Sequence, residues 1–301
     1  MKIFVTGATG YIGGTVSHKL LEAGHEVHGL ARNEERGLLL VNKGITPVIG
    51  TLDDFEVLNK TAIDSDAVIN AADADNPFVA RVLVDALRGS GKYYIQTSGT
   101  SIVSDNAMGR AGGVIYNEDT PLDALPEKAG RIATDQMVLE AANDNVNSVV
   151  ICPCLIYGKG LGVRTHSPQI PTFISLAKSS GIPRHIGSGQ NIWSNVYIED
   201  CADAYLLALE KAPKGSFFYL ESGETSMVAI NQSIGRMLGL GEKTDTFTFE
   251  EAISSWGPPM SYAMSSNVRV SADKARSLLG WKASGPSIFE EIEKGSYKIY
   301  K

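Results

Sequence analysis

Three glycines near the N-terminus have the spacing of turns that bind a dinucleotide. Gly7, Gly10 and Gly13 lie in the run KIFVTGATGYIGGTV, between an expected strand and an expected helix. In such a turn the first glycine permits a tight bend, the second lets backbone amides approach a pyrophosphate, and the third lets the helix pack close to the strand. The partial positive charge of the helix N-terminus favours the same anion. The other turn residues expected to contact the cofactor are Thr9, Tyr11 and Ile12.

The residue after the second strand selects between NAD and NADP. An acidic side chain there binds the ribose 2′-hydroxyl of NAD, whereas a basic one binds the 2′-phosphate of NADP. Here the expected strand ends at Ala31 and is followed by Arg32 and Asn33, without a carboxylate. The planar guanidinium of Arg32 can bind a phosphate through two hydrogen bonds, so the sequence predicts NADP(H). The alternative interpretation is that Arg32 is a solvated residue at a helix start.

The elements that must position these residues alternate along the N-terminal half of the chain. Apolar runs of strand length are separated by segments of helical period, a pattern typical of a parallel sheet covered by helices. Strands are expected over 2–6, 26–31, 45–50, 67–72, 93–98 and 148–153, and helices over 11–23 and 127–143. The segment 100–126 is too long for an ordinary connection, which favours a role in the site. The sequence therefore predicts an α/β fold with a doubly wound parallel (Rossmann) sheet.

The alternation becomes irregular after residue 157, where glycines and prolines separate shorter elements. We predict an NADP-binding Rossmann domain over 1–157 and a smaller, C-terminal substrate-binding lobe over 158–190 and 222–301. The segment 191–221 contains a strand, a helix and the late strand of GSFFYLES. We expect this segment to return to the first domain.

The composition of the chain restricts the classes of molecule that it is expected to bind. The chain has 27 basic and 34 acidic residues, a net charge of -7 and a pI near 5.3. It therefore offers no basic field for nucleic acid or an anionic membrane, and a small-molecule substrate is expected. The first strand begins at once and no apolar run reaches membrane length, which favours the cytoplasm. No metal-ligand spacing is visible, and Cys152 and Cys154 are expected in the core.

Four motifs, in this order, resemble the extended short-chain dehydrogenase/reductase superfamily. They are GATGYIGG, SVVICPCLIYGKG, IEDCADAYLLALE and VSADKARSLLGWKASGPSIFEEI, and they span nearly the whole chain. By resemblance, the adenine is bordered by Thr51 and Leu52, the ribose by Asn70, Ala71 and Ala72, and the nicotinamide by Cys152 and Pro153. Many members of the superfamily dimerise through the helices after the fourth and fifth strands, so a homodimer is an expectation by analogy.

The chain departs from this resemblance at the catalytic pair. Active members carry a Tyr that transfers a proton and, four residues later, a Lys that binds the nicotinamide ribose. Alignment of the helix before the sixth strand puts Glu127 at the tyrosine position and Arg131 at the lysine position. Arg131 can act as a fixed cation and ribose donor, but it cannot lose its proton. The combination resembles an atypical, epimerase- or dehydratase-like subgroup of the superfamily.

The hydroxyl that polarises the substrate carbonyl in the superfamily is also displaced. Gly99 occupies its position in the run QTSGTS, between Ser98 and Thr100. Either neighbour could polarise the carbonyl, and Thr100 is the first candidate because it lies at the expected nicotinamide end of a strand. The alternative interpretation is that Thr100 forms a turn with Gly99.

Three further side chains are candidates for moving a proton, and one histidine is a candidate for the substrate pocket. Glu127 could do so if it were buried, although a carboxylate at a helix start also stabilises the helix dipole. Tyr116 in the long loop and Tyr157 after the sixth strand could do so, or could serve packing. His166 titrates near neutral pH and lies in VRTHSPQIP, a stretch that lines the substrate pocket in the superfamily.

Three functions remain open on these residues. The favoured one is an NADP(H)-dependent oxidoreductase acting on a small carbonyl or alcohol, with Arg131 fixing the cofactor and Thr100 or a nearby tyrosine assisting proton transfer. The second is a nucleotide-sugar epimerase or dehydratase, which the missing tyrosine and Arg32 disfavour. The third is a non-catalytic regulator that senses NADP.

Overall fold

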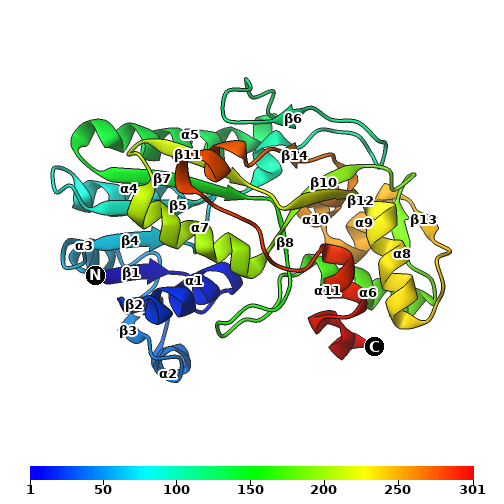
Figure 1. Ribbon diagram of the computed structural model, residues 1–301, viewed down its shortest axis with the longest axis horizontal. Helices are drawn as coiled ribbons and strands as arrows, with labels where there is room; N and C mark the ends of the chain where they lie inside the picture. Colours follow the sequence, from blue (N-terminus) through cyan, green and yellow to red (C-terminus); the bar gives the residue numbers. More distant parts are fainter.

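A seven-stranded parallel sheet forms the centre of the computed structural model, which describes residues 1–301 (Figure 1). The strand order is β11-β7-β5-β4-β1-β2-β3, so the chain reverses direction across the sheet between β1 and β4. The strands are β1 (Lys2–Thr6), β2 (Glu26–Ala31), β3 (Thr46–Ile49), β4 (Ala67–Asn70), β5 (Tyr93–Thr97), β7 (Asn147–Pro153) and β11 (Ser216–Leu220). This confirms the predicted doubly wound α/β fold. In such sheets ligands bind at the carboxyl ends of the strands, at the point of reversal.

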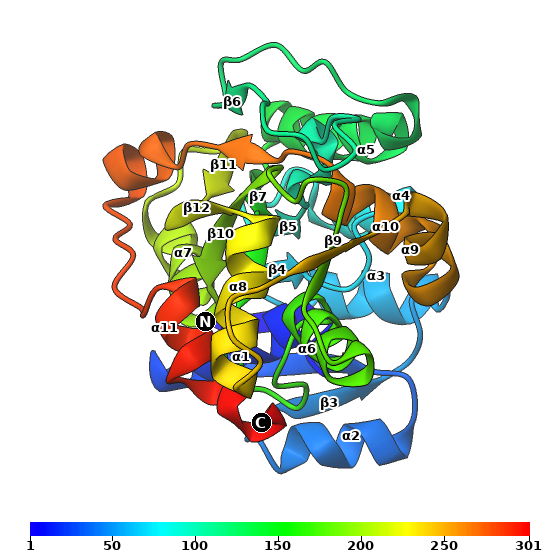
Figure 2. The same cartoon turned by 90° about the vertical axis from the view of Figure 1, so that its right-hand side faces the viewer.

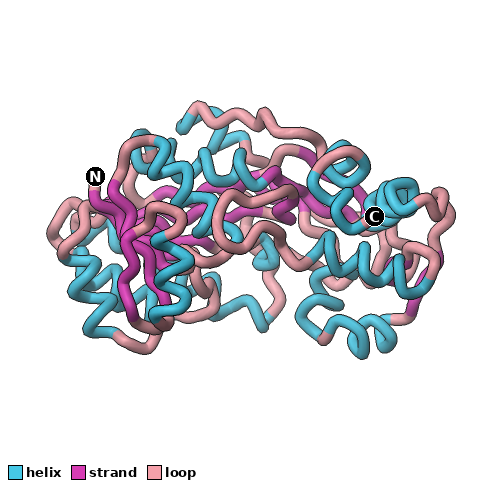
Figure 3. Tube along the Cα trace, turned by 90° about the horizontal axis from the view of Figure 1, so that it is seen from below, coloured by secondary structure: helices cyan, strands magenta, loops and turns pink.

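Two hydrophobic cores lie on the two faces of this sheet. In β1, Ile3 and Val5 pack in one core with α1 (Tyr11–Glu22), α2 (Glu34–Val41) and α7 (Ile198–Lys211). Phe4, between them, packs in the other core with α3 (Phe55–Ile63), α4 (Pro77–Leu87) and α5 (Ala129–Glu140). Successive side chains of a strand point to opposite faces, so both faces must be covered when a strand is continuously apolar. Figure 3 shows the strands between helices at one end of the molecule.

The predicted helix over 127–143 is interrupted at both ends. A short 3-10 turn (Pro126–Lys128) precedes α5, and a second one (Ala141–Asp144) follows it. The second turn closes at Asn145, whose φ of 57° is left-handed and cannot continue a helix. The long loop before α5 contains another 3-10 turn (Thr100–Val103) and strand β6 (Ile115–Tyr116), which pairs with β14 (Arg269–Val270).

Smaller elements form the C-terminal part of the fold (Figures 1 and 2). Strands β8 (Leu155–Tyr157), β10 (Ile192–Tyr197) and β12 (Gly223–Ser226) form one sheet, and β9 (Arg184–Ile186) pairs with β13 (Asp245–Phe247). The helices are α6 (Gln169–Ser180), α8 (Met227–Leu238), α9 (Phe249–Trp256), α10 (Pro258–Ser265) and α11 (Ile288–Glu293). A π-helical turn (Ala275–Leu279) and a C-terminal 3-10 turn (Ser296–Tyr300) complete the chain.

The segment 191–221 divides between the two sheets. Strand β11 pairs with β7 at the edge of the large sheet, and α7 packs against α1. Strand β10, which precedes them, instead pairs with β8 and β12 in the small sheet. Part of this segment therefore joins the large sheet, while β10 remains outside it.

Two of the motifs that carry the resemblance meet in space. The indole N–H of Trp281 donates to the backbone carbonyl oxygen of Asp200 at 2.7 Å, and Trp281 is almost completely buried. The Asp200 carboxylate accepts from the backbone N–H groups of Ser284 and Gly285, both at 3.0 Å. These bonds tie the C-terminal segment to the start of α7, because a buried carboxylate needs such donors.

Candidate functional site

The glycine turn has the backbone geometry that only glycine provides. Gly7 has a φ of 73°, and a Cβ there would overlap the carbonyl oxygen of Ala71. A Cβ at Gly13 would overlap the carbonyl oxygen of Gly7. The Gly10 N–H donates to the Gly7 oxygen at 2.8 Å, and Gly10 begins α1 without a side-chain cap. The turn therefore holds the N-terminus of α1 close to the end of β4.

A cavity of about 290 Å³ lies against this turn. Its lining residues are Gly10, Tyr11, Ile12, Ala71, Ala72, Cys154, Ile156, Arg164, Ser167, Pro168 and Gln169. The structure thus brings the turn and the segment after β4 together with the segment after β7. The predicted Thr9 is half-buried within the turn, and its side chain does not line the cavity.

The cysteine that lines the cavity is Cys154, whereas the resemblance implied Cys152. Cys152 is completely buried, whereas Cys154 lines the cavity and Pro153 lies between them. Burial raises the pKa of both thiols well above the usual range, so both remain protonated at neutral pH. Cys154 is therefore an uncharged residue of the cavity wall. The sequence pattern does not show which of Cys152 and Cys154 lines the cavity.

The residues predicted for the adenosine half lie at the ends of β2 and β3. The Gly50 N–H donates to the Ala31 oxygen, which places Arg32 beside Thr51. Arg32 is exposed, and none of the chain's ion pairs involves it. Thr51 donates its N–H and hydroxyl to the Asp54 carboxylate, which lowers the pKa of Asp54, and Leu52 packs in the core. Asp54 directly precedes α3, but its carboxylate is turned back to Thr51 and makes no capping hydrogen bond to that helix.

The Arg131 side chain is hydrogen-bonded to two loops at the carboxyl edge of the sheet. Its Nε donates to the Asp75 carboxylate at 2.8 Å, and a second nitrogen pairs with the other oxygen of that carboxylate. A third nitrogen donates to Ser101 Oγ at 2.8 Å. Arg131 is thus a fixed cation between the loops after β4 and β5. Glu127 lies one turn earlier, exposed in the 3-10 turn, and does not line the cavity.

A buried carboxyl group beside Arg131 was missed by sequence reasoning. Asp135 is 5% exposed and accepts a hydrogen bond of 2.6 Å from Ser98 Oγ at the end of β5. Burial raises the pKa of Asp135 to about 6, against the smaller opposing effects of the Ser98 hydrogen bond and of Arg131. Its spacing of four residues after Arg131 puts both on one helix face, and this signal could have identified it.

The other predicted proton-transfer residues lie away from the cavity beside the glycine turn. Thr100 is buried in its 3-10 turn, and Tyr116 is buried in β6. Tyr157 is also buried, and its hydroxyl donates to the Pro286 carbonyl oxygen at 2.8 Å. None of these three side chains lines either cavity, and neither do Ser98, Asp135 and Arg131, which are grouped at the sheet edge.

We therefore expect Tyr157→Phe to affect stability and not chemistry. The change removes the hydrogen bond to Pro286 and should lower the free energy of unfolding by about 1 kcal/mol. NADPH affinity and turnover should remain within twofold of wild type. Denaturant unfolding and steady-state kinetics test this, with Tyr262→Phe, on an exposed tyrosine, as control. A large loss of turnover with normal stability would restore Tyr157 as a catalytic candidate.

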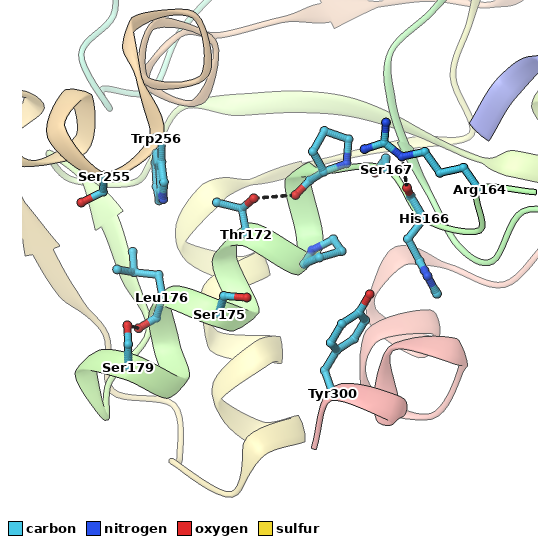
Figure 4. Close-up of a pocket in the computed structure, with 12 residues that line it drawn as sticks. Arg164, His166, Ser167, Thr172, Ser175, Leu176, Ser179, Ser255, Trp256 and Tyr300 are labelled. Atoms are coloured by element: carbon cyan, nitrogen blue, oxygen red, sulfur yellow. Dashed lines mark hydrogen bonds between the residues drawn. The ribbon is translucent and has the colours of Figure 1, made fainter. Parts of the chain in front are cut away.

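A second cavity, of about 680 Å³, adjoins the first (Figure 4). It lies between α6, the end of α9 and the C-terminal turn, and the two cavities share Arg164, Ser167 and Pro168. His166 lines it, with its ring 5.4 Å from that of Tyr297 and 5.8 Å from that of Tyr300. Glu127 does not line this cavity either. Burial lowers the pKa of His166, so its imidazole is neutral at pH 7.

Neither a membrane-crossing helix nor a cluster of metal ligands is present. No helix is both long and apolar enough to cross a bilayer. No three His, Cys, Asp or Glu side chains are grouped so that they could hold a metal ion.

Known proteins share both the sequence pattern and the fold. The model of the NAD dependent epimerase/dehydratase family matches residues 3–219. An uncharacterised protein of Schizosaccharomyces pombe is 33% identical over 99% of this chain and 100% of its own length. A 2-alkyl-3-oxoalkanoate reductase of Stenotrophomonas maltophilia is 28% identical over 74% of this chain and 71% of its own.

A solved structure extends the likeness to three dimensions. The dTDP-glucose 4,6-dehydratase of Bacillus anthracis, in complex with NAD, aligns with a TM-score of 0.78 and 18% identity, covering 100% of this chain and 96% of its own. Together with the family match, this confirms the resemblance to extended short-chain dehydrogenases/reductases. The chain belongs to the NAD dependent epimerase/dehydratase family.

Proposed function

We propose that this protein is an NADP(H)-dependent oxidoreductase that interconverts a small carbonyl compound and its alcohol. The observation that carries the proposal is the cavity between the glycine turn and the segment after β7, which shares Arg164, Ser167 and Pro168 with a second, larger cavity. Gly10 lines this cavity, and a Cβ at Gly7, Gly10 or Gly13 would overlap backbone atoms, so glycine is needed for the close turn that a pyrophosphate can approach. The reductase among the relatives supports the same chemistry.

The preference for NADP rests on Arg32. Its guanidinium is exposed and free of carboxylates at the end of β2, where the 2′-phosphate of NADP would lie. We expect NADPH to bind at least tenfold more tightly than NADH, and Arg32→Ala to remove most of this difference, about 1.4 kcal/mol or more. Calorimetric titration of each nucleotide tests this, with Arg110→Ala as control on another exposed arginine. Equal affinities in the wild type would contradict the assignment of NADP.

The residues at the sheet edge have separate roles in the proposed reaction. A bound nicotinamide dinucleotide supplies or accepts a hydride. Arg131 stays charged and, held by Asp75 and Ser101, is positioned to bind the cofactor ribose. We infer that Ser98 takes the place of the missing tyrosine. In the structure the Ser98 hydroxyl donates to the Asp135 carboxylate. When Asp135 is protonated the direction reverses, so that during reduction Ser98 donates its proton to the substrate oxygen and receives the Asp135 proton in its place.

A carbonyl panel tests the proposed activity. NADPH consumption is followed optically with aldehydes and ketones of varied size, using the wild type, Thr100→Ala, Glu127→Gln and Ser98→Ala. We expect turnover in the wild type and its loss in Ser98→Ala, because Ser98 is hydrogen-bonded to Asp135. Thr100→Ala and Glu127→Gln should retain turnover, because neither side chain is hydrogen-bonded to this pair. Tight NADPH binding together with silence across the whole panel would favour a non-catalytic NADP sensor.

A further inference from the structure

Arg164 occupies the junction of the two cavities. It lines both of them, together with Ser167 and Pro168 at the start of α6 (Figure 4). Its Nε donates to the His166 carbonyl oxygen at 3.2 Å, and no carboxylate lies within ion-pair distance of it. Most other arginines of the chain are paired with carboxylates, so Arg164 retains donors for a ligand.

Charge along the cavity walls is concentrated in this one side chain. Neither cavity is lined by Asp, Glu or Lys, and Arg164 is the only arginine in either wall. His166 is neutral because burial lowers its pKa. An anion that enters either cavity therefore meets one full positive charge in the wall and no wall carboxylate. Arg164 is exposed, so its guanidinium can turn toward a ligand from solvent.

Three of the six hydroxyl groups that line the larger cavity donate to backbone oxygens. The hydroxyl of Ser167 donates to the Ile156 oxygen, that of Thr172 to the Pro168 oxygen, and that of Ser179 to the Leu176 oxygen. The hydroxyls of Ser175, Ser255 and Tyr300 have no hydrogen-bond partner in the protein and remain available to a substrate, whereas Arg164 supplies the only full charge in the cavity wall.

The apolar part of the same cavity is rigid. The Trp256 ring packs edge to face on Phe173 and Phe247, with ring centres 5.4 Å and 4.8 Å away. Leu176 on α6 lines the same cavity. A fixed aromatic surface of this kind binds a planar or apolar molecular body with little loss of side-chain freedom.

We propose, building on the oxidoreductase function above, that Arg164 selects carbonyl substrates that carry an anionic group, a carboxylate or a phosphate. The planar guanidinium binds this group through two hydrogen bonds at the junction. The apolar body of the substrate lies in the larger cavity against Trp256. Arg164 is in this way a specificity-determining residue, separate from the proton-transfer pair at the end of β5.

Matched acids and alcohols test the proposal without turnover. Benzoate is compared with benzyl alcohol, and phenyl phosphate with phenol, by calorimetric titration with and without saturating NADPH. The wild type should bind at least one acid tenfold or more tightly than its uncharged partner. Arg164→Gln should abolish this preference, Arg164→Lys should retain part of it, and Arg110→Gln should leave it intact. The affinity for NADPH should change less than twofold in Arg110→Gln, because Arg110 lines neither cavity. The carboxylate and phosphate arms show which anion is preferred.

Several outcomes would overturn the proposal. One is a wild type that binds no acid more tightly than its partner. Another is an Arg164→Gln variant that loses NADPH affinity but keeps its acid preference, which would assign Arg164 to the cofactor pyrophosphate. A wild type that prefers acids but does not bind NADPH would instead contradict the oxidoreductase function and leave the anion site standing. The two proposals therefore fail separately.

Discussion

Gly10→Val is expected to abolish binding of both NADPH and NADH in a protein that remains folded. A Cβ at Gly10 would lie 2.9 Å from the Gly7 oxygen, which belongs to rigid backbone and cannot move aside cheaply. The branched side chain would also occupy the cavity wall that Gly10 forms. Because the pyrophosphate must approach the backbone here, we expect affinity to fall more than a hundredfold, as measured by calorimetric titration.

A glycine in open space provides the control. Gly24 has a φ of 81°, and a Cβ at this position would have no atom within 4 Å, so Gly24→Ala strains the backbone without filling a site. It should lower the free energy of unfolding and leave nucleotide affinity unchanged. If Gly10→Val bound both nucleotides normally, the turn would have only a structural role. Thermal unfolding of both variants shows that each is folded.

Asp135→Asn is expected to make the protein more stable and less active. Burial raises the pKa of Asp135 from 3.8 to about 6, so the folded state binds its proton more tightly than the unfolded chain does. The free energy of unfolding therefore falls as pH rises through the window from about 4 to 6. A difference of this size corresponds to about 3 kcal/mol once the group is ionised in both states. Asparagine removes this cost, so the stability gain should appear above pH 7 and vanish below pH 4.

The same substitution should lower the rate of carbonyl reduction at least a hundredfold. An amide cannot pass a proton to Ser98, although its oxygen can still accept the Ser98 hydrogen bond. In the wild type the protonated fraction of Asp135 falls as pH rises through about 6, so reduction should slow above that pH. Residual activity of the variant should lack this dependence. NADPH affinity should be unchanged, which separates proton transfer from cofactor binding.

Asp123→Asn makes the same chemical change at an exposed position and should alter neither stability nor the pH profile. Denaturant unfolding at pH 4, 6 and 8 measures the first effect, and kcat/KM across the same range measures the second. A variant with wild-type activity would remove Asp135 from the proton path. A variant of lower stability at pH 8 would contradict the burial argument.

The order of strands and helices could be predicted because it depends on local patterns. The sheet strands expected within 1–157, and the helix at 11–23, agree with the structure to within two residues at each end. The helix over 127–143 was predicted too long, because periodicity does not show where Asn145 turns left-handed. The sequence of β10 indicates a strand but not its partners, and only pairing with β8 and β12 places it outside the large sheet.

The candidate site was predictable only in its contiguous part. The glycine turn is a local motif, because a Cβ at each glycine would contact backbone atoms of the turn or of the strand end beside it. Arg32 could be predicted because it directly follows the last residue of β2. The sequence by itself therefore determined the fold, the dinucleotide turn and the family resemblance. The tertiary structure decided the rest, because Ser98 and Asp135 meet across 37 residues of chain and Arg164 reaches the turn only after the lobes have packed. Burial, and with it the altered pKa of Asp135, arises from that packing and has no local signature.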